Sequence, residues 1–169
     1  MARRTGNPHP KPPSSGGIPS RETLWVPSHY SVEVKRKGGL DRTVYWNVED
    51  VVDFVFPKKY QPTYFKVASD FVSLVLEKGV VTKKEISEFL GKSGYSKPTL
   101  ENKVIPKLVR FGFLKREREI TSGQLGKGRA LILTESLTFT NYLDRLAFAW
   151  NVLVSTSRKR RGGSEQQSI

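Results

Sequence analysis

The chain has 169 residues with 37% hydrophobic content, enough to bury one substantial core, so disorder along its whole length is excluded. Lysine and arginine outnumber aspartate and glutamate by 29 to 16, which gives a net charge of +13 and a sequence pI near 10.1. This balance favours a polyanionic partner such as DNA, RNA or an anionic lipid surface.

The residue inventory excludes several kinds of site. There is no cysteine, which excludes disulfides and cysteine-ligated zinc, and only His9 and His29 are available as imidazole ligands. We therefore expect no metal and no cofactor. The most apolar stretch, 146–154, is shorter than the roughly 20 residues that span a bilayer, and the N-terminus lacks the apolar block of a secretory signal. We expect no membrane partner and a cytoplasmic, nucleoid-associated location.

Two end segments and a short extension flank the predicted core. Residues 1–22 and 157–169 are rich in small, basic and turn-forming residues, which predicts flexible basic tails that either touch phosphates or are merely solvated. Within 23–60, alternation over 30–35, the pair Gly38-Gly39 and an extended pattern over 43–46 predict a β-hairpin. Asn47 is then placed to cap a short helix.

Two helices are predicted next. Apolar residues recur at helical spacing from Pro62 until Gly79, which indicates a first helix. Thr82 and Glu85 have the spacing of a capping box, so they predict the start of a second helix, with its stop at Gly91.

A third helix is predicted over 97–111, with Ser96 as its N-cap and Pro98 in its first turn. At about 100° per residue it divides into two arcs. The arc expected to face the core contains Leu100, Val104, Leu108 and Phe111, and the polar arc contains Thr99, Asn102, Lys103, Pro106 and Arg110. Because Pro106 cannot donate to the carbonyl of Asn102, we expect a bend or a division of the helix there.

A basic wing and a long helix complete the pattern. Segments 113–120 and 129–133 are strand-like and flank a glycine-rich turn at 121–128, and the stretch from Lys92 to Arg129 holds ten basic and three acidic residues. Residues 135–156 form an amphipathic stripe, which predicts a helix that either packs back on the domain or pairs with a second copy. The residues expected at such a homodimer contact are Phe139, Tyr142, Leu143, Leu146 and Trp150.

Residues 62–133 resemble the winged helix-turn-helix superfamily, particularly small archaeal and bacterial regulators of the MarR, PadR and ArsR type. The resemblance is carried by the segments 82–85, 96–100, 108–114 and 126–128. It implies a mainly α fold with a small β wing, an α+β class. The winged domain would span 61–134, after the 23–60 extension and before the 135–156 helix. It also implies that the third helix enters a major groove while the wing follows a minor groove or the backbone.

The resemblance implies a set of DNA contacts. The candidates are Lys97, Thr99, Asn102, Lys103, Lys107 and Arg110 on the helix, with Lys127 and Arg129 on the wing. Lysine and arginine mostly meet phosphates, whereas the amide of Asn102 can pair with an adenine edge. We therefore expect a double-stranded DNA-binding protein, a transcriptional regulator, and not an enzyme.

Other functions stay open. The chain would otherwise be a non-catalytic module in a replication, transcription or ribosome assembly, or a non-specific chromatin or plasmid coat, and RNA remains an alternative ligand. A large exposed apolar patch around Trp25, Trp46 or Trp150 would favour the interaction module. Catalysis has little support, because the carboxylate pairs Asp50/Asp53 and Glu85/Glu88 lack a base partner in the sequence.

Overall fold

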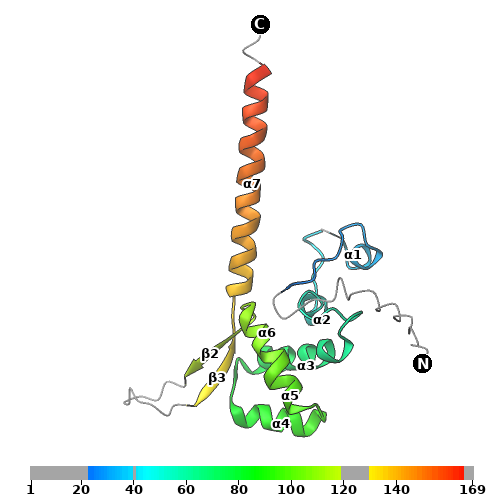
Figure 1. The fold of residues 1–169 in the computed structure, drawn as a ribbon, viewed down its shortest axis with the longest axis vertical. Coiled ribbons are helices and arrows are strands. Elements are labelled where there is room, and N and C mark those ends of the chain that lie inside the picture. Colours follow the sequence, from blue (N-terminus) through cyan, green and yellow to red (C-terminus); the bar gives the residue numbers. More distant parts are fainter. Residues whose placement is uncertain (1–22, 40, 119–129, 166–169) are drawn as a thin grey trace, which may run out of the picture. The chain divides into compact units, whose positions relative to one another are not determined.

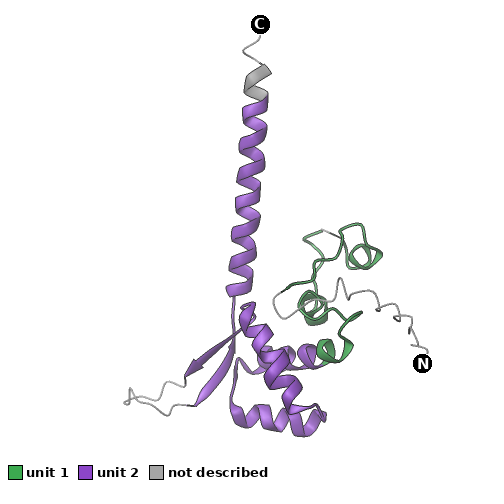
Figure 2. Ribbon diagram, viewed as in Figure 1, with its two compact units in different colours: residues 1–66 green, residues 67–169 purple. Residues whose placement is uncertain are grey.

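The computed structural model describes residues 23–39, 41–118 and 130–165, which divide between two compact units, 1–66 and 67–169 (Figure 2). The predicted N-terminal tail, the glycine-rich turn at 121–128 and the last residues of the C-terminal tail lie outside the described residues. The class is mixed α+β, as expected.

Within its described residues, the first unit contains two short helices, the beginning of a third helix that continues beyond residue 66, and no strand. Helix α1 (Val32–Arg36) occupies part of the segment where the sequence predicted a β-hairpin, so that prediction is wrong. The hydroxyl of Ser31 accepts a hydrogen bond from the Val34 amide at 3.2 Å and caps α1. Gly38 and Gly39, both with positive φ, follow its end. The hydrogen bond of this cap favours a helix here, although the alternating apolar pattern favours a strand.

Helix α2 (Val48–Val52) begins where the sequence predicted it. Asn47 is its N-cap and forms a reciprocal capping box with Asp50, whose amide donates to the Asn47 side chain at 2.9 Å. Lys37 links the end of α1 to this helix, because its ammonium lies 3.0 Å from Asp50 and 3.4 Å from Asp53. Trp46 donates its indole N–H to the Lys37 carbonyl at 3.0 Å.

Helix α3 (Pro62–Lys78) has the predicted bounds. Its buried apolar residues recur at helical spacing and include Val67, Phe71 and Val75. Gly79 ends the helix with φ of +73°, a backbone conformation that favours glycine. The short strand β1 (Val80–Val81), which the sequence did not predict, follows directly.

Helix α4 (Lys83–Ser93) begins at the predicted capping box, where the Thr82 amide donates to the Glu85 carboxylate at 2.8 Å. The predicted stop at Gly91 is wrong, because α4 continues for two more residues. Gly94 is the C-cap, with φ of +69° and an amide that donates to the Leu90 carbonyl. Gly91 lies inside the helix, and Gly94 is the glycine that adopts the left-handed conformation at its end.

Strands β2 (Leu114–Arg118) and β3 (Leu131–Glu135) pair antiparallel (Figure 1). Strand β1 pairs antiparallel on the other side of β3. The strand order is therefore β1-β3-β2. The buried residues of the second unit come from its helices and from all three strands. They include Ala68, Phe71, Val75, Val81, Leu100, Val104, Ile105, Leu108, Leu114 and Leu133.

Helix α7 (Thr138–Glu165) extends away from the other elements of the second unit (Figure 1). It does not end near residue 156, as predicted, but continues through the basic run 158–161. Its start is fixed by Gly112, whose carbonyl accepts from the Phe139 amide at 3.1 Å. Every residue from 140 to 153 is exposed. Among the described helices, none is long and apolar enough to cross a membrane.

Candidate nucleic-acid interface

The third helix is divided at Pro106, as the sequence predicted. It consists of α5 (Lys97–Thr99), a π-helical turn (Leu100–Val104) and α6 (Ile105–Arg110), with Pro106 in the first turn of α6. The Ile105 amide donates to the carbonyl of Leu100, five residues earlier. Because Pro106 has no N–H to give to the Asn102 carbonyl, the wider turn accommodates the missing bond without breaking the helix.

The two faces of this helix mostly match the predicted arcs. Leu100, Val104 and Leu108 are fully buried, while Phe111 is half-buried. The exposed residues are Lys97, Asn102, Lys103, Pro106 and Arg110, and Thr99 is half-buried. An amide and several cations therefore share the outer side of the helix.

Lys107 does not belong to that outer face, which corrects its prediction as a DNA contact. It is only 4% exposed, and this burial lowers the pKa of its ammonium to about 8. The spacing of apolar residues in the sequence indicates that position 107 is buried. Lys107 follows Val104 by three residues and precedes Phe111 by four, which is the spacing of one helical face. The charge of Lys107 led to its assignment to the exposed face of the helix, although its spacing places it on the buried face.

Strand β2 adds cations that the predicted site omitted. Lys115, Arg116 and Arg118 are exposed, and β2 lies against α6, the helix that ends at Arg110. The signal was present in the strand pattern, since a two-stranded ribbon with no cover exposes both alternating faces. Lys127 and Arg129 of the predicted wing lie outside the described residues.

Ion pairs within this surface do not remove its charge. Lys97 lies 4.0 Å from Glu101, and Lys115 lies 2.7 Å from Glu117, with more than half of each lysine side chain exposed. Exposed pairs of this kind contribute only about 0–1 kcal/mol. A phosphate can therefore compete for both lysines.

The turn before the third helix is held from two sides. The Tyr95 hydroxyl donates to the Asp70 carboxylate on α3, and burial together with this bond raises the pKa of Tyr95 to about 12. Phe89 of α4 makes an edge-to-face contact with Phe71, at 5.6 Å between ring centroids. These contacts fix α4 and the following turn to α3, so the start of α5 is positioned by the core.

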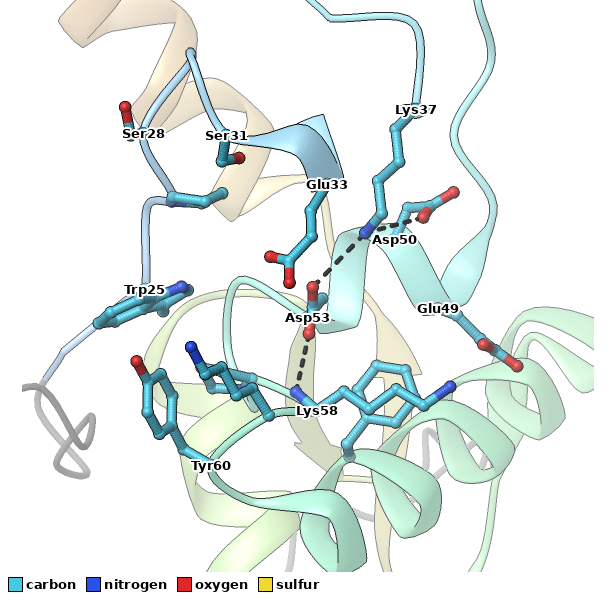
Figure 3. Close-up of a pocket in the computed structure, with 14 residues that line it drawn as sticks. Trp25, Ser28, Ser31, Glu33, Lys37, Glu49, Asp50, Asp53, Lys58 and Tyr60 are labelled. Carbon is cyan, nitrogen blue, oxygen red and sulfur yellow. Dashed lines mark hydrogen bonds and ion pairs between the residues drawn. The ribbon is translucent and has the colours of Figure 1, made fainter. Parts of the chain in front are cut away.

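A separate cavity of about 520 Å³ lies in the first unit (Figure 3). Trp25 and Tyr60 meet edge to face on one side of it, with ring centroids 5.0 Å apart. Asp53 accepts from the Lys58 amide at 2.8 Å and pairs with Lys37, as the dashed lines mark. No group of three potential metal ligands occurs among the described residues. These interactions give the lining a structural role.

Comparison with family models, with curated proteins and with solved structures finds no match to this chain.

Proposed function

We propose that the second unit is a winged helix-turn-helix domain that binds double-stranded DNA. The order α3, β1, α4, α5 to α6, β2 and β3 supports this proposal, as does the strand order β1-β3-β2. In this arrangement α4 and the divided third helix form the helix-turn-helix, and the β2–β3 ribbon forms the wing. The third helix would lie in the major groove.

The observation that carries the proposal is the exposed face of the third helix. Lys97, Lys103 and Arg110 stand on the same helix as the exposed amide of Asn102, and basic β2 lies against α6. Cations of this kind neutralise phosphates and fix the position of the protein, whereas an asparagine can pair with the adenine edge. Phosphate binding and base recognition would then come from one surface.

We further propose that the protein regulates transcription by binding alone. An exposed Asn102 between cations suits a site that prefers certain base sequences over others. Such preference distinguishes a regulator from a non-specific coat. A cytoplasmic, nucleoid-associated location follows from this role and is part of the same proposal.

Duplex binding measured by fluorescence anisotropy tests the proposal. With about six phosphate contacts, affinity should fall roughly a thousandfold between 50 and 200 mM salt. The double variant Lys97→Glu, Lys103→Glu should abolish binding. Its matched control is Lys35→Glu, Arg36→Glu, which makes the same charge change on exposed residues of the first unit. Equal losses in the two variants, or affinity that barely responds to salt, would contradict the proposed surface.

A second candidate is a non-catalytic interaction module in a larger nucleoprotein assembly. The specific observation in its favour is Trp150, which is 65% exposed on α7, whereas Trp25 and Trp46 are half-buried. Absence of duplex binding, with oligomers that form through α7, would favour this candidate over the first.

A further inference from the structure

Helix α7 exposes large apolar side chains on several sides. They are Tyr142, Leu143, Leu146, Phe148, Trp150, Val152 and Leu153. The only charged residues between positions 139 and 154 are Asp144 and Arg145. A helix that is apolar on most of its circumference is normally buried in the working protein. Within the described chain, residues 140–153 have no cover.

The exposed apolar area is large enough for a stable interface. From typical side-chain areas, the five of these residues that lie on one side of the helix expose roughly 600 Å² of apolar surface per copy, at the upper limit of the largest patch on a typical monomer. They are Tyr142, Leu143, Leu146, Trp150 and Leu153. A standard interface buries about 800 Å² per partner, about two thirds of it apolar in homodimers. One α7 helix therefore carries the apolar area that a dimer needs.

The spacing of the apolar residues suits pairing with another helix. Leu143, Leu146, Trp150 and Leu153 alternate at intervals of three and four residues, which is the a and d pattern of a coiled-coil seam. The positions that flank this seam include Ala147, Ala149 and Val154. These side chains carry no charge, and the two alanines are small enough to let a second helix approach closely.

We propose that α7 pairs antiparallel with α7 of a second copy of this chain. In the register that buries the whole seam, Leu143 lies opposite Leu153 of the other copy, and Leu146 lies opposite Trp150. Every large seam residue of one copy then meets a large seam residue of the other, so the surface is complementary to itself. That is the condition for an isologous two-fold interface.

The basic run 158–161 determines the orientation. A parallel pair would place two copies of Arg158-Lys159-Arg160-Arg161 side by side. In the antiparallel pair the two runs are about 35 Å apart at 1.5 Å per residue, well beyond the screening length of about 8 Å. Each run then lies at the level of the start of α7 in the other copy, where β3 ends at the exposed residue Glu135. Charge thus favours the antiparallel pair.

Phe139 serves a different purpose from the one predicted for it. Its ring stacks on Phe113 with centroids 4.1 Å apart and is only half exposed, so it anchors α7 to its own unit. The pairing surface therefore begins at Tyr142. It involves none of the residues proposed to contact DNA, so the two proposals succeed or fail separately.

Light scattering after size exclusion, without nucleic acid, tests the pairing. The expected mass is twice the chain mass of 19.1 kDa, or an even multiple if pairs associate further. Leu146→Glu should raise the dissociation constant about a hundredfold or more, because two seam leucines per pair are lost. Asn151→Glu is the matched control on the outer side of α7 and should leave the mass unchanged. Circular dichroism checks that α7 stays helical in both variants.

Disulfide trapping tests the orientation, since the chain contains no cysteine of its own. A mixture of Leu143→Cys and Leu153→Cys chains should cross-link, while neither variant cross-links efficiently alone. Cross-linking of each variant with itself would overturn the antiparallel orientation. A wild-type monomer over micromolar concentrations would overturn the pairing, and a monomer that binds anionic lipid vesicles would assign α7 to a lipid surface instead.

Discussion

Phe113 stacks face to face on Phe139, so the residue just before β2 holds the second residue of α7. Gly112 lies directly before Phe113 in the chain, and its carbonyl accepts a hydrogen bond from the Phe139 amide. The Ser136 amide donates to the Phe113 carbonyl at 2.9 Å. This junction is the place where α7 is attached to the rest of the second unit, and its geometry leaves no room for a larger residue at position 112.

Gly112→Ala should therefore destabilise the second unit more than Gly79→Ala. Both glycines have positive φ, +76° and +73°, so both variants incur about 1 kcal/mol of backbone strain. Only at Gly112 would the new Cβ also lie 2.7 Å from the Thr138 Cβ, which adds about 1–3 kcal/mol of overpacking. Urea unfolding followed by circular dichroism measures the difference. Equal effects would show that the junction can relax.

Asn102→Ala should broaden the set of duplexes that the protein selects from a random pool, because the proposed adenine contact is lost. Lys103→Ala, at the neighbouring exposed position, should weaken all duplexes alike and reduce the salt slope by about one. Sequencing the selected pools and titrating each variant separates the two effects. Unchanged selectivity in the Asn102 variant would remove it from the proposed readout.

Lys107→Met should make the stability of the second unit depend less on pH between 8 and 10.5, because an uncharged side chain of similar length replaces a buried ammonium. The folded pKa of about 8 lies below the ordinary 10.5, so the unfolded chain binds more protons between these values. Wild-type stability should therefore rise from pH 8 to 10.5, and the methionine variant should lack this contribution. Thermal unfolding across this range tests it, with exposed Lys103→Met as the control.

Glu85→Gln should lower stability at neutral pH but not near pH 2. The pKa of Glu85 falls to about 2, first through its hydrogen bond from Lys78 at 2.8 Å and then through bonds from Thr82. The stabilisation is complete above the ordinary value of 4.5 and is lost as pH falls toward 2. Acid unfolding curves of wild type and variant should converge there. Glu88→Gln, whose carboxylate lies 3.9 Å from Lys84, should have little effect.

The sequence predicted the elements whose signals are local and agree with one another. The capping boxes at Asn47 and Thr82, the helix end at Gly79 and the division at Pro106 all depend on chemistry within one or two turns. The hairpin over 30–46 failed because the same alternating residues also allow a capped helix at Ser31, and only the surrounding contacts decide. Gly91 and Gly94 are equally able to end a helix, so α4 could not be bounded from composition.

The candidate site was predicted less completely than the fold. Helical spacing identified the exposed positions of Asn102 and Lys103, but charge was given more weight than spacing at Lys107. The cations of β2 were counted in the net charge yet not assigned to the surface, although four consecutive charged residues in a strand indicate that neither face is covered. The two-residue strand β1 was missed because the strand with which it pairs, β3, lies far along the chain.

If the helices pair as proposed, the length of α7 sets the distance between the two domains of the dimer. Removal of seven residues from the paired segment would keep the seam facing its partner and bring the two domains closer by a step of about 10 Å. Removal of five would rotate the seam by about 140° away from its partner and separate the copies. The length of α7 would then determine the spacing between the two half-sites on DNA. Variants with shortened helices would bind half-sites at different spacings.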